Sequence, residues 1–464
     1  MRGGPVLAGA GRAVTLAAAG TSRGAMLRLA WPIVVANSAA PLLGLVDTAV
    51  IGNLGTAVGL GAIALGSLVA SFVYWTFGFL RMGTTGFVAQ ASGADDSAEV
   101  RAAVLRALLL GGAIGVFLVL LQRPIEWIAF GLLGASPEVE QGARGYIEIR
   151  IWGAPAALAT YALVGALVGL ARTGYVLAVQ LVLNGLNIAL DLTFAGWLGW
   201  GVRGVALGTV ASEWVTLLVA AGLLARLLRD GHRDAEPIVP WARILDRAKA
   251  LRTLAANADI LARTFFLLLG FAWFTNASAR LDDTTLAANH VLLQLISLSA
   301  YLLDGYAHAT EIWVGRAVGT RSLETFDSAA RSATELAAAS AAVLGGGIFV
   351  LGDLVTAVLT DIDAVRQVAS RHLPYAATYV VVSFAAFQLD GIFVGATRTR
   401  DMRDASIASF LVFVCASLLL LSRFGNAGLW CAFVMYVSVR AVTLGVRVPA
   451  LRATLRGGQV SRVR

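Results

Sequence analysis

The stretch LAWPIVVANSAAPLLGLVDTAVIGNLG (29–55) decides the fold class, because it reads as a membrane span that carries a single charged side chain, Asp47. The next charged residue along the chain is Arg81. An ionisable group in hydrocarbon costs several kcal/mol unless it faces protein or water and finds a partner. Asp47 is therefore a candidate functional residue, and the rest of the sequence has to supply its neighbours.

The composition extends this interpretation to the whole chain. Hydrophobic residues make up 58% of the 464 residues, charged residues only 14%, and the mean hydropathy is +0.77. A soluble domain could not bury so much apolar surface, so the sequence predicts an integral membrane protein. The 50 glycines suit close packing between membrane helices.

Charge and motifs exclude several other classes of protein. The net charge is +8, but the basic residues fall between the apolar runs, where they set topology rather than bind nucleic acid. Cys415 and Cys431 both lie in late apolar stretches, so we expect neither a disulfide framework nor a zinc site. The sequence has no phosphate-binding G-x-x-x-x-G-K-[ST] loop and no HExxH, CxxC or GxSxG motif. We therefore expect no enzyme, no cofactor and no bound metal.

Runs of about 20 apolar residues predict twelve transmembrane helices. They lie at 27–51, 60–91, 101–121, 147–170, 173–198, 203–228, 253–277, 286–317, 328–351, 372–397, 403–423 and 426–450. Most basic residues lie at the termini and in the even-numbered connections, seven of them between Arg226 and Arg252 alone. Because basic loops stay in the cytoplasm, both termini are expected to be cytoplasmic.

The polar middle connection divides the chain into two halves of six spans. The predicted parts are a cytoplasmic tail (1–25), a first lobe (26–228), a cytoplasmic linker (229–252), a second lobe (253–450) and a cytoplasmic tail (451–464). This gives an all-α polytopic protein with two pseudo-symmetric six-helix lobes.

The two halves resemble each other at a nearly constant offset in residue number. GTTGFVAQASG (83–93) aligns with ATEIWVGRAVG (309–319) at an offset of 226, and GVRGVALG (201–208) aligns with GNAGLWCA (425–432) at an offset of 224. Six spans per half give both halves the same orientation, and two such bundles form the usual frame for alternating access. A duplicated scaffold with no transport role is the alternative. The first of these offsets equates Asp47 with Trp273, which is not a carboxylate.

Three further residues in the first half are expected near Asp47. Asp47 follows Arg28 by 19 residues and Asp191 follows Arg172 by 19, so both carboxylates lie roughly 28 Å up their helices. Asn187 lies one turn before Asp191 on the same face, and Thr209 lies early in the descending sixth span. At the repeat offset Asp191 corresponds to Ser417, so the carboxylates belong to the first half only.

Two carboxylates in a poorly hydrated pocket cannot both ionise cheaply, so such a pair is suited to carrying a proton. The alternative is a hydrogen-bonded cluster that only locks helices together. Pro32 and Pro41 lie in the first span and can bend it, because proline frees a backbone carbonyl. We expect this bend to respond to protonation.

A second polar cluster is expected in the inner half of the membrane. Arg81, Arg263, Asp304 and Asp390 lie at similar depth. Opposite charges at matched depth tend to pair, so Arg263 should pair with Asp304 or Asp390, either as a structural ion pair or as a charged patch on a cavity for cationic substrates. Weaker candidates are Glu213, Glu311 and Arg440.

Six ordered motifs resemble the DinF branch of the multidrug and toxin extrusion (MATE) transporters. They are PLLGLVDTAVIG (41–52), FGFLRMGTTGFVAQASGA (77–94), LNGLNIALDLTF (183–194), GVRGVALGTVASEW (201–214), LLDGYAHATE (302–311) and QLDGIFVGATRTRDMRDA (388–405). The resemblance implies export of amphipathic, often cationic compounds in exchange for H⁺ or Na⁺. It also implies a cation site in the first lobe made of Asp47, Asn187, Asp191 and Thr209, and an acidic residue of the tenth helix at Asp390.

The sequence thus predicts a proton-coupled antiporter in the cell (inner or plasma) membrane. Arg263 and Trp273 lie in the seventh helix, where some branches of the family carry an acidic residue; this disfavours a sodium site in the second lobe. Na⁺ remains the second choice of coupling ion. The expected partners are small organic substrates and the lipid bilayer, with the monomer as the functional unit. A flippase for a lipid-linked precursor is the closest alternative, and a polytopic enzyme is the third.

Overall fold

A computed structural model describes residues 22–38, 57–132, 136–230, 237 and 239–460. Every regular element in these ranges is a helix, and no strand occurs among them. Two compact units account for the fold: one contains the residues up to Val34 together with 255 onward, and the other contains 35–254. The described residues 22–34 therefore group with the second half of the chain, whereas the sequence predicted that 26–34 belong to the first lobe.

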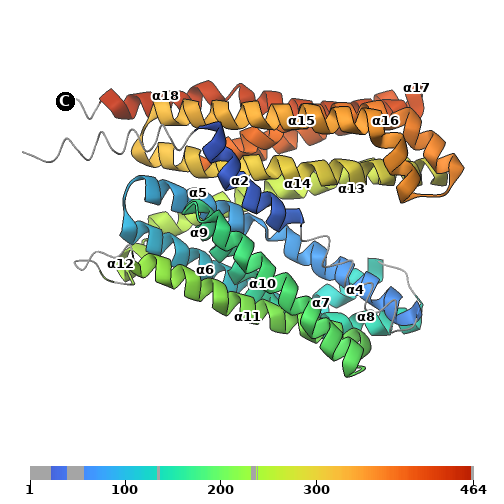
Figure 1. Cartoon of the computed structure of the whole chain (residues 1–464), viewed down its shortest axis with the longest axis horizontal. Coiled ribbons are helices and arrows are strands. Elements are labelled where there is room, and N and C mark those ends of the chain that lie inside the picture. The colour runs from blue at the N-terminus through green and yellow to red at the C-terminus, as the bar shows by residue number, and fades with distance from the viewer. Residues whose placement is uncertain (1–21, 39–56, 133–135, 231–236, 238, 461–464) are drawn as a thin grey trace, which may run out of the picture. The chain divides into compact units, whose positions relative to one another are not determined.

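The 35–254 unit contains the helices of the first half of the chain after α2 (Arg23–Ser38). Its elements are α4 (Ala57–Thr76), α5 (Phe79–Gly93), α6 (Ser97–Leu120), α7 (Gln122–Leu132), α8 (Pro137–Arg150), the 3₁₀ turn η1 (Ile151–Gly153), α9 (Ala154–Gly169), α10 (Thr173–Asp191), the π-helical turn η2 (Leu192–Trp197), α11 (Gly201–Asp230) and α12 (Trp241–Ile244). Helix α9 packs against α5, α6 and α11, and α10 packs against α11 (Figure 1).

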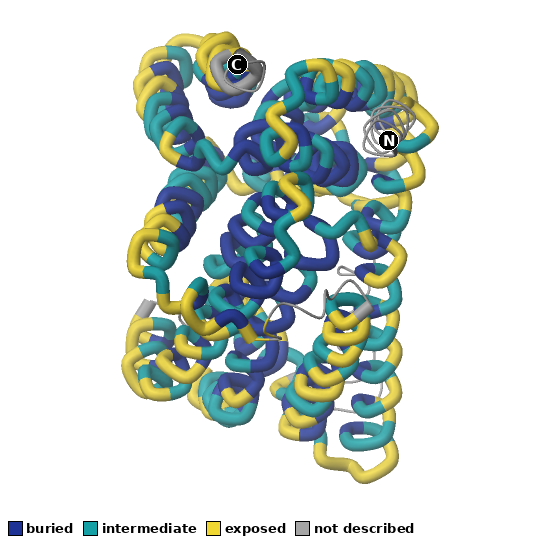
Figure 2. Tube along the Cα trace, turned by 90° about the vertical axis from the view of Figure 1, so that its left-hand side faces the viewer, coloured by how far each residue is buried: buried dark blue, intermediate teal, exposed yellow. Residues whose placement is uncertain are grey.

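The other unit holds the longest helices. They are α2 (Arg23–Ser38), α13 (Arg247–Ala279), α14 (Asp283–Thr320), α15 (Leu323–Leu359), α16 (Asp363–Gly395), α17 (Thr399–Gly445) and α18 (Val448–Val460). Helix α16 is central, because it packs against α14, α15 and α17 (Figure 1). Buried residues line the faces that the helices turn to one another, and exposed residues line the outer faces (Figure 2).

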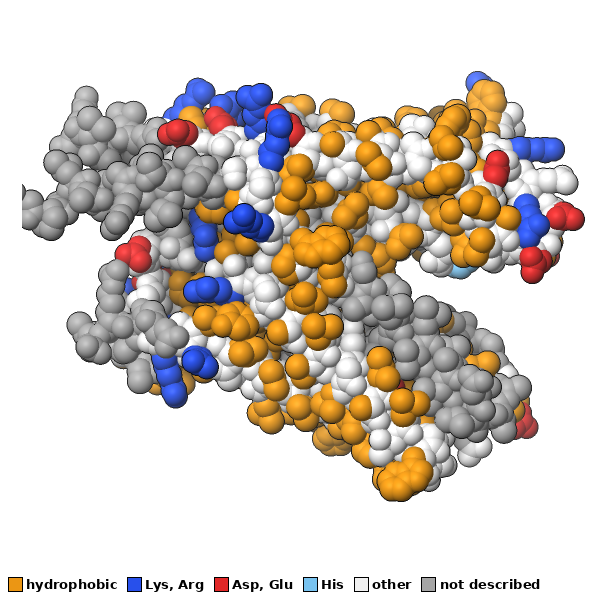
Figure 3. All heavy atoms as spheres, in the orientation of Figure 1, with side chains coloured by type: hydrophobic (Ala, Val, Ile, Leu, Met, Phe, Trp, Pro, Cys, Tyr) orange, Lys and Arg blue, Asp and Glu red, His pale blue; other side chains and the backbone are white. Residues whose placement is uncertain are grey.

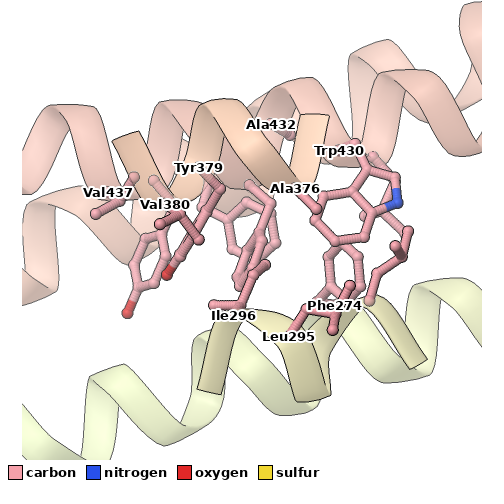
Figure 4. Packing of buried hydrophobic residues seen from close by; sticks show 14 of the residues in the cluster. Phe274, Leu295, Ile296, Ala376, Tyr379, Val380, Trp430, Ala432 and Val437 are labelled. Carbon is pink, nitrogen blue, oxygen red and sulfur yellow. The ribbon is translucent and has the colours of Figure 1, made fainter. Parts of the chain in front are cut away.

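An aromatic cluster forms the core of the second half. Phe433 stacks on Tyr379 with ring centroids 4.6 Å apart and also contacts Phe274 at 4.6 Å. Trp430 meets the Phe274 ring edge-on at 4.9 Å. Leu295 and other aliphatic side chains pack beside these rings (Figure 4). Aromatic side chains bury large areas, so this cluster fixes α13, α14, α16 and α17 to one another.

Ten helices of the described ranges are long and apolar enough to cross a membrane. Two features account for the difference from the twelve expected spans. Residues 39–51 of the first span lie outside the described residues, and the last two spans run together from Thr399 to Arg456. The backbone breaks inside that segment at Gly425, which has φ +56° and ψ −136°. This break lies between the two spans that the sequence predicted, 403–423 and 426–450.

Large apolar side chains remain exposed along the middle of these helices. Leu68, Leu109, Leu218 and Val343 are examples. In the space-filling view hydrophobic side chains cover the middle of the helices, while Lys, Arg, Asp and Glu gather near their ends (Figure 3). Such surfaces are stable in lipid rather than in water, so they support a membrane-spanning fold.

The internal repeat is visible in the backbone. Residues with positive φ occur in corresponding turns of the two halves, and glycine is not required at all of them. The pairs are Asp95 (54°) with Arg321 (56°), Ala171 (60°) with Thr397 (52°), and Gly201 (53°) with Gly425 (56°). The first two pairs are separated by the offset of 226 residues and the third pair by the offset of 224, as the alignment of the two halves requires.

Close helix contacts repeat as well. A Cβ on Gly165 would overlap the carbonyl oxygen of Arg81, and a Cβ on Gly391 would overlap that of Ala307. The repeat offset equates Gly165 with Gly391 and Arg81 with Ala307. The same helix–helix approach is therefore built twice from a glycine against a backbone carbonyl.

The segment between the halves is tied to the first one. Nη1 of Arg243 donates to both carboxylate oxygens of Asp96 at 2.6 Å, and Nζ of Lys249 donates to Glu99 at 2.5 Å. Burial opposes ionisation of Asp96, but the hydrogen bonds from Arg243 and from the Glu99 amide lower the pKa of its carboxyl below the usual range. These residues lie outside the spans, where charge pairs are hydrated.

The end of the chain differs from the tail expected over 451–464. Helix α18 continues to Val460, and it buries Leu451 and Leu455 against the second half. Nη2 of Arg452 donates to Asp327 on α15 at 2.6 Å. Leucines one turn apart give this segment an apolar face, which explains why it packs rather than remains a tail.

Candidate functional site

The first-half cluster expected from the sequence is built on α10 and α11. Asn187 and Asp191 lie one turn apart on α10, and both are fully buried at 0% exposure. Nδ2 of Asn187 donates a hydrogen bond to Oγ1 of Thr209 on α11 at 3.1 Å. Thr209 in turn donates to the carbonyl of Val205 at 2.9 Å, one turn earlier in its own helix. Three of the four expected site residues are therefore adjacent, and the fourth, Asp47, lies outside the described residues.

The backbone around Asp191 is shaped to hold this carboxylate. The π-helical turn η2 begins at the next residue, Leu192, and such turns are frequent at functional sites. Helix α11 approaches α10 at Gly208, where an added Cβ would overlap Oδ1 of Asp191. Among the described residues, Oδ1 of Asn187 has no hydrogen-bond partner. A buried carboxylate beside an amide acceptor gives a site that suits a proton or a small cation.

The corresponding positions of the second half are apolar or weakly polar. Asn187 corresponds to Phe413 at the larger repeat offset, and Thr209 corresponds to Phe433 at the smaller one. The two phenylalanine rings contact each other with centroids 5.6 Å apart, where the first half has the amide–hydroxyl hydrogen bond. The same packing position thus holds a polar contact in one half and an aromatic contact in the other.

The expected bend in the first helix is described only in part. Pro32 lies inside α2, whose described residues end at Ser38. Pro41 lies outside the described residues.

The second cluster is an ion triad on three helices. Asp390 of α16 pairs with Arg263 of α13 and with Arg440 of α17. Asp390 and Arg440 are buried, and the side chain of Arg263 is 11% exposed. From the sequence, Arg263 was expected to pair with Asp304 or Asp390, and Arg440 was a weaker candidate. Two guanidinium groups around one carboxylate give the triad an excess of positive formal charge, so Asp390 alone does not form a negative patch.

Asp304 and Glu311 lie on α14, on either side of a histidine that the sequence argument did not single out. Nε2 of His308 lies 3.7 Å from Oδ2 of Asp304, and Nδ1 lies 3.9 Å from Oε1 of Glu311. Metal-binding motifs and intramembrane Asp, Glu and Arg were the features sought in the sequence, so His308 was not identified. Its position between two intramembrane carboxylates, at i−4 and i+3, is the signal that identifies it.

Glu213 belongs to a buried ion pair with Arg150. The contact is bidentate, with Nη1 to Oε2 at 2.8 Å and Nη2 to Oε1 at 2.6 Å. The hydroxyl of Tyr74 donates to the carbonyl of Arg150 at 2.8 Å, and the guanidinium lies 4.8 Å from the Tyr74 ring centroid. Arg150 was not predicted, although an opposite charge near the same end of the neighbouring spans could have identified it. Arg81 lies on α5 and is half-buried.

No group of three or more His, Cys, Asp or Glu side chains within the described ranges could hold a metal ion.

Comparisons with known proteins agree with this arrangement. A family model described as MatE matches residues 32–193 and 260–419, and the repeat offset equates the ends of the two matches, 193 and 419. The chain is 36% identical over 434 residues to DNA damage-inducible protein F of Escherichia coli (strain K12), covering 93% of each protein. It is 29% identical over 444 residues to the Probable multidrug resistance protein NorM of Rhizobium meliloti (strain 1021), covering 91% of this chain and 92% of that protein.

A solved structure gives the same result for the fold. The crystal structure of MATE in the bent conformation matches with a TM-score of 0.83 at 20% identity, covering 94% of this chain and 96% of that one. The prediction of an all-α polytopic membrane protein is confirmed.

Proposed function

The chain belongs to the MatE family of membrane transporters, and we propose that it exports amphipathic organic compounds, often cationic, in exchange for protons. One relative is named as a probable multidrug resistance protein, which supports this substrate class. The protein is a multi-pass membrane protein that acts on small molecules, and no part of the proposal requires enzymatic chemistry.

One observation carries the proposal. In the first half the buried carboxylate of Asp191 lies one turn from the amide of Asn187, which donates to the hydroxyl of Thr209. The equivalent positions of the second half are Ser417, Phe413 and Phe433. A polar group needed only for packing has no reason to be confined to one copy of a duplicated fold. A carboxylate that gains and loses a proton can be confined to one copy, because burial makes its charged form costly and only a functional role justifies that cost.

The proposed site also includes Asp47. At the repeat offset Asp47 corresponds to Trp273, and the indole of Trp273 donates to Ser417, which corresponds to Asp191. This contact supports a pairing of Asp47 with Asp191 in the first half. Two carboxylates that face each other share a proton readily, because both cannot be ionised cheaply in a poorly hydrated site.

The cycle that we propose begins with a proton from outside binding the Asp47–Asp191 pair. Neutralisation changes the hydrogen bonds to Asn187 and Thr209 and the bend of the first helix at Pro32 and Pro41, which releases substrate. The lobes then rock inward, and the proton leaves to the cytoplasm. We place both termini in the cytoplasm and the protein in the cell membrane as a functional monomer.

The test is export from proteoliposomes under gradients imposed one at a time. The purified full-length protein should release an amphipathic cation such as a fluorescent dye when a proton gradient is imposed, and should not do so with a sodium gradient alone. Release driven by sodium and not by protons would assign Na⁺ as the coupling ion. Absence of release under both gradients would contradict coupled export.

One observation favours the second candidate, a flippase for a lipid-linked precursor. Arg263 and Arg440 lie on either side of Asp390, and two guanidinium groups side by side can donate several hydrogen bonds to an anionic head group. Translocation of a fluorescent anionic lipid in the same proteoliposomes, without cation export, would support that function instead.

A further inference from the structure

Helix α14 carries three titratable side chains on one face. Asp304, His308 and Glu311 are spaced at i, i+4 and i+7, which places them in a row along the helix. Nε2 of His308 lies 3.7 Å from Oδ2 of Asp304, and Nδ1 lies 3.9 Å from Oε1 of Glu311. Each ring nitrogen therefore faces a different carboxylate, so a proton can arrive at one nitrogen and leave from the other.

The row leads from an accessible group to buried ones. The side chain of Asp304 is 38% exposed, whereas those of His308 and Glu311 are 3% exposed. Seven residues separate Asp304 from Glu311, which is roughly 10 Å along the helix axis. The direction is toward Thr320, where α14 ends. A buried histidine between two carboxylates is uncommon inside a membrane span and marks a functional group.

The neighbouring helices add an ion triad to this row. Arg263 of α13 interacts electrostatically with Asp304 and Glu311. Arg263 also pairs with Asp390 of α16, and Asp390 pairs with Arg440 of α17. The six groups thus form one electrostatic cluster within the second half.

The charges of the cluster depend on His308. Two arginines and three carboxylates leave one excess negative charge while the imidazole is neutral, and a protonated imidazole balances it. In a low-dielectric interior a balanced set of charges is favoured over an unbalanced one. The adjacent helices carry two further ion pairs. Arg23 of α2 and Glu335 of α15 pair at the surface at 2.5 Å, and the buried Asp259 of α13 pairs with Arg403 of α17 at 2.7 Å. Arg28 of α2 is exposed.

We propose that His308 is a second proton-binding site, which relays protons between Asp304 and Glu311 in the second half. In one transfer the Asp304 carboxyl gives its proton to Nε2, while Nδ1 gives its own to Oε1 of Glu311, so one proton moves and the ring ends neutral. Both gaps are longer than a hydrogen bond, and a carboxylate rotation or a bridging water closes them during transfer. This inference rests on the proposed proton-coupled export.

The relay belongs to the second half alone. At the repeat offset Asp304, His308 and Glu311 correspond to Gly78, Met82 and Thr85, respectively. None of these three titrates near neutral pH. The two halves therefore differ in a second respect besides the Asp191 site.

The relay lies beside the first helix. A Cβ on Gly305 would overlap the side chain of Val34 in α2, and Ala30 of α2 packs in the same cluster as Tyr306 and Ala309. Helix α2 precedes Asp47 in the sequence and contains Pro32. A change of charge at Asp304 or His308 therefore acts next to the helix that the proposed cycle bends.

Histidine NMR on the full-length protein in nanodiscs tests the site directly. The chain has four histidines, so the resonance that disappears in His308→Gln identifies this ring. We expect this resonance to titrate between pH 5 and 8. Asp304→Asn combined with Glu311→Gln should lower the ratio of protonated to neutral imidazole at pH 7 by ~10-fold, because two nearby negative charges are removed. A resonance whose chemical shift does not change with pH, or whose titration is the same in the Asp304→Asn, Glu311→Gln double variant, would overturn the proposal.

Transport separates this proposal from the proposed function. In proteoliposomes His308→Gln should reduce the protons moved per substrate and shift the pH profile of export. The matched control His372→Gln should leave both unchanged, since Nδ1 of His372 lies 2.7 Å from the Val368 carbonyl rather than beside a carboxylate. If His308→Gln kept the wild-type number of protons moved per substrate and the wild-type pH profile of export, the relay would be refuted and proton-coupled export would stand. Absence of proton-driven export in the wild type would refute the proposed function, and the NMR titration would still decide whether His308 binds a proton.

Discussion

Nε1 of Trp273 donates a hydrogen bond to Oγ of Ser417 at 2.7 Å, which joins α13 to α17. These are the residues that the internal repeat equates with Asp47 and Asp191. In the second half these two positions are therefore in contact, through groups that do not titrate. Beside this contact, Phe413 and Phe433 occupy the positions that correspond to Asn187 and Thr209, so these polar groups too are replaced by groups that do not titrate. The pattern indicates one duplicated frame whose buried titratable side chains lie at different positions in the two halves.

Gly208→Ala should impair export without removing any polar group. The added methyl overlaps Oδ1 of Asp191, so the carboxylate or α11 has to shift, and a displacement of this size at a functional group can cost about 100-fold in rate. The rate of proton-driven export measures the effect. Gly185→Ala on the same helix as Asp191 is the control, because nothing lies within 4 Å of its added methyl. Equal export rates for the two variants would show that the fit at Gly208 does not matter.

Gly165→Ala and Gly391→Ala should destabilise the protein by similar amounts. Each places a methyl against a backbone carbonyl that cannot move aside, and overpacking of this kind costs about 1–3 kcal/mol. Thermal unfolding in detergent measures the loss. Gly346→Ala, whose added methyl meets nothing within 4 Å, should be neutral. Strongly unequal losses would argue against structural equivalence of the two halves.

Glu213→Leu should be among the most destabilising substitutions in the first half. It leaves the buried guanidinium of Arg150 without its carboxylate, and breaking such a pair costs about 3–5 kcal/mol. The double variant Arg150→Met with Glu213→Leu should recover most of the loss, since no charge is then left buried. Substitution of the exposed Arg331 is the control and should change the thermal stability little. If the double variant were no more stable than Glu213→Leu, the loss of stability would come from packing and not from the unpaired charge of Arg150.

The anchoring of the linker should depend on pH with a defined sign. The pKa of Asp96 is lower in the folded protein than in the unfolded chain, so its contribution is present above the unfolded value of about 4 and is lost as the pH falls through the folded value. Asp96→Asn should therefore lower the melting temperature at pH 7, and the difference from the wild type should shrink below pH 4. A difference independent of pH would assign the effect to the helix cap that Asp96 gives to Glu99.

Hydropathy and the repeat predicted most of the fold, because both depend on the solvent and on helix geometry. The span predicted over 173–198 occupies Thr173–Trp197, and the break between the last two spans lies at Gly425. The α18 helix was missed because it is too short and too polar to resemble a span.

The site could be predicted only where depth and helix face determine a contact. Asn187 and Asp191 share a face of α10, and Thr209 lies at the matching height on α11, so their proximity follows from counting residues. Counting did not reveal that Asp390 has two arginine partners, because the side from which Arg440 approaches depends on how α17 packs on α16. Counting also did not reveal Arg150 as the partner of Glu213, because that pair depends on how α8 packs on α11.

The most direct test of the central claim is proton-driven export by Asp47→Asn, Asp191→Asn and Ser417→Ala in proteoliposomes. Ser417→Ala removes the side chain at the position of the second half that corresponds to Asp191, so it controls for loss of a helix contact. The account predicts that both aspartate variants lose proton-driven export while still binding substrate, and that Ser417→Ala exports at close to the wild-type rate. Export at the wild-type rate by either aspartate variant would contradict it.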